Sequence, residues 1–217
     1  MKRIRVMALA FLAAAVLATG CAKMGASGKG APVENSVMIE KDGSVQWASV
    51  ETYEKGDYTL EEMKEAAQKR ISDYNSFLGK EAKSENAEGA DKLPVALVSA
   101  ELSDGKASMV TEYDSATRLI EFAREIGDYN VTFTALETGR AAVLGQNLDG
   151  VNFKDAKGDA VDAAQVASDG QRVVVKAEGP GVVKTEKKVL YISDGCSLRD
   201  ANTVQTPEEG TSYIVIE

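Results

Sequence analysis

One cysteine near the start of the chain has the surroundings needed for covalent modification of its sulfur. Cys21 follows the uncharged stretch VMALAFLAAAVLATG, and that stretch follows the basic residues of MKRIR. A basic start, an apolar middle and a small-residue cleavage site make a secretory signal. The apolar run from Val6 to Val16 is too short to span a bilayer core, which takes roughly 20 apolar residues. The pattern therefore predicts export of the chain, with a sulfur nucleophile at the cleavage site.

The residues LATGC, which end at Cys21, resemble the lipobox of bacterial lipoproteins. The resemblance implies that a diacylglyceryl group is attached to the Cys21 thiol and that cleavage removes residues 1–20. The match departs from the family pattern at Ala18, where leucine is usual. Two acyl chains anchor a protein stably, because each buried methylene contributes about 0.8 kcal/mol. The alternative is an ordinary secreted protein that is cleaved elsewhere and carries Cys21 by chance.

The absence of histidine and the scarcity of cysteine exclude several kinds of site. The 217 residues contain no histidine and two cysteines. This excludes Ser-His-Asp and Cys-His catalysis and histidine-ligated zinc. With Cys21 acylated, Cys196 has no intramolecular partner, so no disulfide is expected, and it is interpreted as a small apolar core residue rather than a nucleophile. No cofactor or metal site is predicted.

Other candidate chemistry has structural explanations. Five Asp-Gly pairs and the stretch NFKDAKGDAVD suggest calcium, but none has the ligand spacing of an EF-hand loop, and turn formation explains them better. Arg140 in LETGRAAVLGQ is a candidate for anion binding at a helix start, or part of a loop that joins a strand to a helix. Trp47, the one tryptophan, is a candidate for ligand stacking or for the core. A Ser-Lys pair or a carboxylate pair stays open as a hydrolase site.

The charge of the chain bears on its partners. The formal charge is −9, and loss of the leader's three basic residues lowers it to −12. Nucleic acid is excluded as a partner because phosphate binding requires a basic surface. The same argument disfavours electrostatic attachment to anionic lipid, so membrane association would depend on the lipid at Cys21.

The chain after Cys21 divides into a tether and a folded region. Residues 21–35 are rich in Gly, Ala, Ser and Lys and are predicted to be a flexible tether, and residues 36–217 are predicted to form one domain. Asp42-Gly43 and Asp104-Gly105 each lie between apolar-alternating runs, which predicts two hairpins. Residues 79–92 are interpreted as an exposed loop.

Two amphipathic helices are expected between and after these hairpins. The first begins at a capping box of Thr59 and Glu62, and Gly79 follows its end. Its apolar stripe is Leu60, Met63, Ala67, Ile71, Tyr74 and Leu78. Its charged residues are interpreted as a solvated face. The second helix has Asp114 as the expected N-cap and Gly127 as the expected stop.

The second half of the chain reads mainly as strands, at YNVTFTALE, QRVVVKAE, VVKTEKKVLYIS and SYIVIE, with a short helix over residues 159–167. Strands and helices that do not alternate strictly predict an α+β fold, with two main amphipathic helices on a largely antiparallel sheet in a single domain.

The stretches EKDGSVQWASVETYEKGDYTLEEMKE and KKVLYISDGCSLRDANTVQTPEEGTSYIVIE resemble a group of short uncharacterised cell-surface lipoproteins of Gram-positive bacteria. The resemblance implies export and one folded domain. It implies no active-site residues, because the group has no established activity.

Taken together, the sequence predicts a lipid-anchored protein on the extracytoplasmic face of the cell membrane. We expect it to act by binding another envelope protein or a small ligand, through the face of its sheet or the edge of a strand. The alternative is an envelope hydrolase that uses carboxylates or a Ser-Lys pair.

Overall fold

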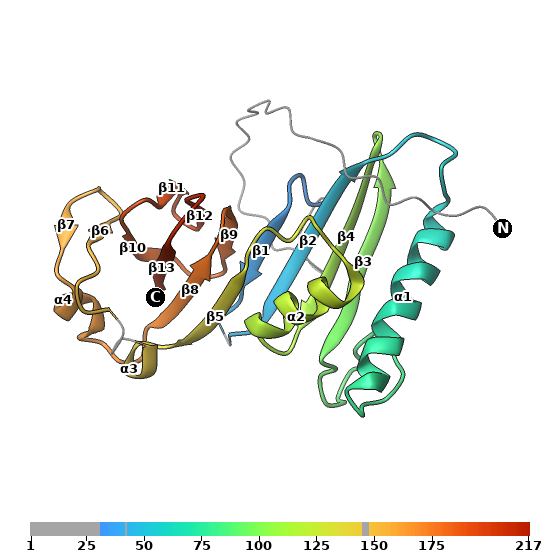
Figure 1. The fold of residues 1–217 in the computed structure, drawn as a ribbon, viewed down its shortest axis with the longest axis horizontal. Helices are drawn as coiled ribbons and strands as arrows, with labels where there is room; N and C mark the ends of the chain where they lie inside the picture. The colour runs from blue at the N-terminus through green and yellow to red at the C-terminus, as the bar shows by residue number, and fades with distance from the viewer. Residues whose placement is uncertain (1–30, 42, 145–147) are drawn as a thin grey trace.

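The computed structural model describes residues 31–41, 43–144 and 148–217, and shows an elongated molecule built on two sheets (Figure 1). Sheet A has seven strands in the order β11-β12-β9-β1-β2-β4-β3, and sheet B has six in the order β5-β8-β13-β10-β6-β7. The strands of sheet A are β1 (Ser36–Ile39), β2 (Val45–Thr52), β3 (Val95–Ser103), β4 (Lys106–Tyr113), β9 (Gly181–Thr185), β11 (Ser197–Asp200) and β12 (Thr203–Thr206). Those of sheet B are β5 (Ala135–Arg140), β6 (Phe153–Asp155), β7 (Ala160–Val161), β8 (Val173–Glu178), β10 (Val189–Ser193) and β13 (Thr211–Ile216).

The mixed α+β class and the mainly antiparallel pairing are confirmed, but the expectation of one sheet is wrong. The strands form two sheets, and β1 pairs with β9 in parallel. The chain passes from sheet B to sheet A between β8 and β9, which are joined by a turn at Gly179 and Pro180. Local sequence patterns indicate strands but carry no information about which distant strands pair, so they do not predict the division into two sheets.

The two expected hairpins are present. β1 pairs with β2, with Ile39 opposite Val45, although Asp42 of the connecting turn lies outside the described residues. β3 and β4 are joined at Asp104 and Gly105, which have φ values of 51° and 73°. Positive φ at both positions is the geometry of a tight two-residue hairpin turn, and glycine adopts it without steric cost.

The helices are α1 (Leu60–Phe77), α2 (Ala116–Ile126), α3 (Ala141–Leu144) and α4 (Ala163–Ala167). The capping box of α1 is confirmed: Thr59 Oγ1 accepts from the Glu62 N–H at 3.2 Å, and Glu62 accepts from the Thr59 N–H at 2.8 Å. The N-cap of α2 lies one residue later than the expected Asp114, because Ser115 Oγ, and not the Asp114 carboxylate, accepts from the Arg118 N–H. Asp114 instead pairs with the Arg118 guanidinium. Gly127 ends α2 with φ 67°, as expected.

The short helix expected over residues 159–167 is shorter in the structure. α4 covers only Ala163–Ala167, and β7 occupies the beginning of the expected range. β11 and β12, near the C-terminus, were not expected as strands.

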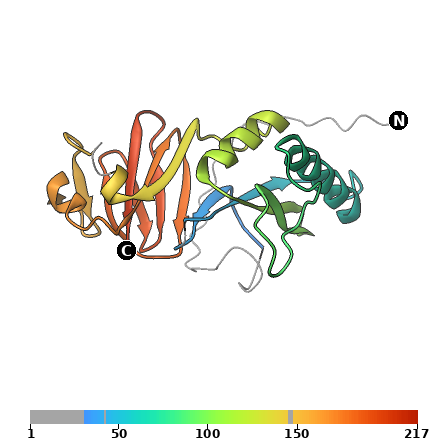
Figure 2. The same ribbon diagram turned by 90° about the horizontal axis from the view of Figure 1, so that it is seen from below.

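Helices α1 and α2 lie on one face of the β1–β4 part of sheet A (Figure 2). Beneath them, the largest core cluster includes Trp47 on β2, Ile71 on α1 and Leu119 on α2. The same cluster continues through Val183 on β9 to Ile214 on β13 in sheet B. Among the described residues, none of the helices combines the length and the apolar character of a membrane-spanning helix.

Candidate functional site

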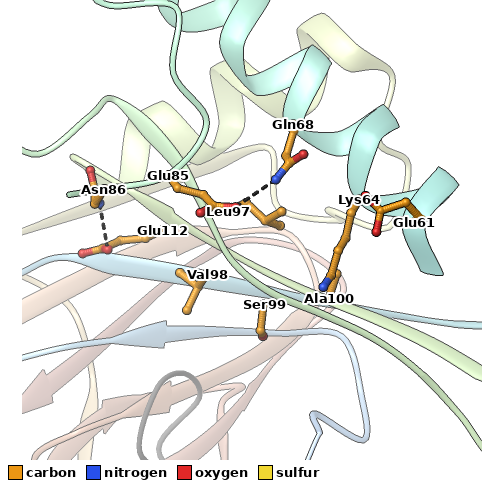
Figure 3. A pocket seen from close by; sticks show the side chains of 10 residues that line it. All are labelled: Glu61, Lys64, Gln68, Glu85, Asn86, Leu97, Val98, Ser99, Ala100 and Glu112. Carbon is orange, nitrogen blue, oxygen red and sulfur yellow. Dashed lines mark hydrogen bonds between the residues drawn. The ribbon is translucent and has the colours of Figure 1, made fainter.

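An open groove with a volume of about 710 Å³ lies between the N-terminal half of α1 and the edge strand β3 (Figure 3). Glu61, Lys64 and Gln68 of α1 form one wall, and residues 97–100 of β3 form the floor. Glu85 and Asn86, from the loop between α1 and β3, line the other side together with Glu112 of β4. The groove is open to solvent and mainly polar, which distinguishes it from the enclosed apolar pockets that hold most small ligands.

The groove exists because α1 packs closely on the sheet only along its C-terminal half. Ala67, Ile71 and Tyr74 are buried, whereas Leu60 and Met63, at the start of the same apolar stripe, are only half-buried. The predicted stripe is therefore real, but sheet A covers only part of it. The polar residues beside its open end become the wall of the groove.

Asn75 attaches the loop after α1, which lines the groove, to the start of β3. Its side chain is fully buried, and Nδ2 donates to the carbonyl oxygens of Lys83 and Val95, each at 2.8 Å. Its Oδ1 accepts from the Val95 N–H at 3.2 Å. One side chain thus joins α1, the following loop and the first residue of β3, and all of its hydrogen-bonding groups are used where water cannot replace them.

The loop is attached to the groove walls by polar side chains. Gln68 Nε2 donates to Glu85 Oε1 at 2.9 Å, which joins the loop to α1. The Glu112 carboxylate accepts from Asn86 Nδ2 at 3.2 Å and from Lys92 Nζ at 2.7 Å, which joins the loop to β4 (Figure 3). The charge of Glu112 is therefore balanced within the protein.

Lys64 extends from α1 toward β3 near Ala100 (Figure 3) and forms no ion pair within the described part of the chain. Ser99 lines the same groove, so a serine and a lysine do lie near each other. However, no hydrogen bond joins their side chains among the described contacts, and Ser99 points away from α1 (Figure 3). A Ser-Lys hydrolase needs that hydrogen bond for activation of the nucleophile. The geometry of Ser99 and Lys64 therefore gives no support to the Ser-Lys alternative.

The outer edge of β3 has bonded backbone groups at its beginning. The Val95 N–H donates to Asn75, and the Leu97 N–H donates to the Ser84 carbonyl oxygen at 2.6 Å. These residues therefore direct their backbone groups away from β4. A register shift between Leu97 and Ser99 leaves Val98 as an extra residue, which is a β-bulge.

Beyond the bulge the outer edge of β3 has no backbone partner among the described residues. Alternation in an antiparallel pair then directs the N–H and C=O groups of Ala100 and Leu102 outward. The hairpin turn leads to the same orientation. Ser103 and Lys106 close the turn as a hydrogen-bonded pair, so the backbone groups of Ser103 point toward β4 and those of Leu102, the next residue back along β3, point outward. β3 is the last strand of sheet A, and no described backbone group outside the sheet reaches Ala100 or Leu102.

A second polar cluster lies beyond the end of α2 and includes two carboxylates. Asn130 connects them: its backbone N–H donates to Asp128 Oδ1 at 3.0 Å, and its side-chain Nδ2 donates to Glu51 Oε1. Burial raises the pKa of Asp128 above its usual value, and the neighbouring Glu51 charge raises it further. The hydrogen bonds from Asn130 act in the opposite direction but do not outweigh burial. Because both carboxylates accept hydrogen bonds from the same asparagine, the cluster joins β2 to the end of α2 and is best explained as a structural bridge.

The other residues singled out from the sequence lie apart from the groove. Cys21 is outside the described residues. Trp47 is a core residue with 3% of its surface exposed, which excludes ligand stacking. Cys196 is a half-buried free thiol that packs against the main core. Arg140 ends β5 and donates to the Gln171 carbonyl oxygen, so it closes a loop, and α3 behind it has only four residues.

The acidic stretch NFKDAKGDAVD forms a turn. Asp155 Oδ1 accepts from the Lys157 N–H at 2.8 Å and from the Asp159 N–H at 3.0 Å, and these bonds hold the pKa of Asp155 below its usual range. Within the described residues, no three Asp, Glu or Cys side chains are grouped as metal ligands would be.

The sequence did not identify the groove. Glu61 and Lys64 were interpreted as part of a solvated helix face, and Glu85 and Asn86 as part of an exposed loop. The one available signal was the spacing of Glu61, Lys64 and Gln68, which places three polar groups on one side of the helix. Searches of protein-family models, curated proteins and solved structures found no match to the chain.

Proposed function

We propose that the protein is a lipid-anchored binding protein on the extracytoplasmic face of a bacterial cell membrane, and that its groove binds an extended segment of another envelope protein. The lipid is attached at Cys21, as the lipobox-like sequence predicts. From Cys21 to Glu34 the chain reaches at most about 45 Å when extended, at roughly 3.5 Å per residue. The start of the folded region, at Glu34, would therefore lie within this distance of the membrane surface.

The observation that carries the binding function is the free backbone edge at Ala100 and Leu102, beside an open groove. An extended peptide can add to such an edge through main-chain hydrogen bonds, while neighbouring pockets take its side chains. The earlier part of the same edge is already bonded to Asn75 and Ser84. The unbonded part of the edge meets the groove at Ala100, the last residue of β3 that lines it.

We also infer that residues 36–217 act as one unit. The main core cluster contains residues of both sheets and of both long helices, including Val95 on β3 and Ile216 on β13. The Glu34 carboxylate, just before β1, pairs with Lys184 at 3.4 Å and with Arg199 at 2.9 Å, which attaches the start of the fold to β9 and β11. A continuous core of this extent supports one domain, not two independent ones.

The test is an Ala100→Pro substitution, with Glu101→Pro as its matched control. Proline has no N–H, so Ala100→Pro removes an outward donor and leaves the pairing with β4 intact. Glu101 directs its N–H toward β4, so Glu101→Pro breaks the sheet itself. The probe is the peptide Ser-Thr-Val-Lys-Val-Thr-Ser, with capped ends and an uncharged dye, and binding to the full-length protein is measured by fluorescence polarization.

We expect the wild-type protein to bind the probe, and Ala100→Pro to weaken binding at least about tenfold while the protein stays folded. This follows from the loss of a main-chain hydrogen bond of about 1 kcal/mol together with exclusion of the strand by the proline ring. Glu101→Pro should lower the unfolding free energy by about 1–3 kcal/mol, because it leaves a buried carbonyl unpaired. Equal binding by wild type and Ala100→Pro would show that strand addition at this edge is not the mode of binding.

A further inference from the structure

The free part of β3 carries a single charged side chain. Glu101 lies between Ala100 and Leu102 and is exposed. A small core cluster of Met38, Ala48 and Val110 lies on the face of sheet A away from the helices. Glu101 is opposite Ser108 of β4, and Ser108 is two residues from Val110, so the Glu101 side chain points to that same face. Lys106 is its diagonal neighbour on β4, and no ion pair joins the two among the described contacts. A strand added to this edge would place one of its side chains directly opposite Glu101.

The walls of the groove add further negative charge. Glu61 and Glu85 both line it, and neither forms an ion pair with a described residue. Glu112 is balanced by Lys92, and Lys64 is the one basic residue among those that line the groove. The edge and the groove together therefore favour a basic segment, and the net charge of −9 on the whole chain would steer such a partner toward it.

The same charge argues against a second copy of this chain as the occupant. Antiparallel pairing of two β3 edges through Ala100 and Leu102 centres the two-fold axis on Glu101. The two Glu101 side chains would then be directly opposite, about 5 Å apart at Cβ, and like charges in that position are destabilising. Charged residues on edge strands prevent self-association in this way.

Resting on the proposed function, we propose that the segment bound at β3 is a strand of a partner protein that carries lysine or arginine at the position opposite Glu101. The backbone edge of β3 contributes binding free energy for any extended segment, whatever its side chains. Glu101 favours segments with a basic residue opposite it, and Glu61 and Glu85 favour basic segments more weakly.

The test is a charge swap on both sides of the pair. The Lys probe described above is compared with a probe in which glutamate replaces its lysine, on wild-type protein and on Glu101→Lys. Glu88→Lys is the matched control, because Glu88 is exposed in the loop and does not line the groove, yet the substitution changes the net charge equally. Unfolding by urea confirms that the three proteins have the same stability.

We expect wild type to bind the Lys probe about three- to tenfold more tightly than the Glu probe, as cross-strand and local charge pairs of this kind allow. Glu101→Lys should reverse the order, and Glu88→Lys should keep it. If both probes bind wild type equally and Ala100→Pro weakens both, the proposed charge selection is wrong while the binding function stands. If neither probe binds wild type, the proposed function itself fails.

Sedimentation velocity tests whether a second copy of this chain, instead of a partner protein, occupies the β3 edge. Wild-type protein should be monomeric at the concentrations used for binding. A wild-type dimer that dissociates on Ala100→Pro would identify a second copy as the occupant and overturn the proposal. Glu101→Val, which removes the repulsion, should increase self-association relative to wild type.

Discussion

Asn75 provides the sharpest test of how the groove is held in place. Its buried side chain makes three hydrogen bonds, two to carbonyl oxygens of Lys83 and Val95 and one from the Val95 N–H. Asn75→Ala removes all three and leaves the Val95 N–H without a partner at the start of the edge strand. No other described hydrogen bond reaches that N–H group.

The expected cost follows from this count. Three hydrogen bonds contribute about 1 kcal/mol each, and an unsatisfied buried donor adds about 1–3 kcal/mol. We therefore expect the unfolding free energy to fall by roughly 4–6 kcal/mol. For a domain of this size, each kcal/mol lowers the melting temperature by about 2–4 °C, so the total decrease is roughly 8–24 °C.

The assay is urea unfolding followed by tryptophan fluorescence. Trp47 is the one tryptophan in the chain and lies in the core beneath the helices, so its emission reports loss of that core directly. Asn86→Ala is the matched control, because Asn86 lies in the same loop and also makes two hydrogen bonds, to Glu112 and from Leu93, but is exposed. Water can replace those bonds, so the control should cost less than about 1 kcal/mol.

If Asn75→Ala were no more destabilising than Asn86→Ala, the buried hydrogen bonds would not anchor the loop and β3. The role of Asn75 in joining α1, the following loop and β3 would then be wrong. A large loss of stability together with an unchanged slope against urea would support it, since the slope reports the surface exposed on unfolding.

Three further predictions concern other parts of the molecule. Cys21→Ser should abolish membrane retention and palmitate labelling, because the thioether needs sulfur; equal labelling of wild type and variant would contradict the lipid anchor. Gly181→Ala should destabilise the protein by about 1–3 kcal/mol, because a Cβ there would lie 2.3 Å from the Phe133 ring; in a Phe133→Ala background the penalty should largely disappear, and an unchanged penalty would refute the steric explanation. Asp128→Asn should raise the unfolding free energy at pH 7, because the raised pKa of Asp128 means that its ionised form is disfavoured in the folded state. The wild type should regain this stability as the pH falls through that pKa, so the two proteins should converge in acid; a difference that is constant with pH would show that the charge of Asp128 is not responsible.

Local signals in the sequence were sufficient for the first half of the fold. A tight two-residue hairpin turn requires positive φ values, which Asp104 and Gly105 adopt more easily than most residues. The Thr59 capping box satisfies helix donors within four residues. Hairpin turns and capping boxes depend on residues that are close together in the sequence, so the sequence predicts them. The cap of α2 shows the limit of this, since Asp114 and Ser115 are both suitable residues and only the backbone geometry selects Ser115.

The arrangement of the second half required the tertiary structure. The strands β11 and β12 are short and contain few apolar residues, so they have little periodicity to detect. They form because β12 pairs with β9, and β9 pairs with β1 across more than half of the chain. The β1–β9 contact joins the two halves, and no local pattern predicts it.

The sequence by itself determined that Cys21 is the candidate for lipid attachment, that histidine-dependent catalysis is absent, and that hairpins and capped helices form the first half. These properties depend on residue types and short spacings. Only the tertiary structure decided that Lys64, Glu85 and Ala100 share one groove and that the edge of β3 is free beside it. Those residues are brought together by the packing of α1 and by a bulge in β3, and both depend on contacts between residues far apart in the chain.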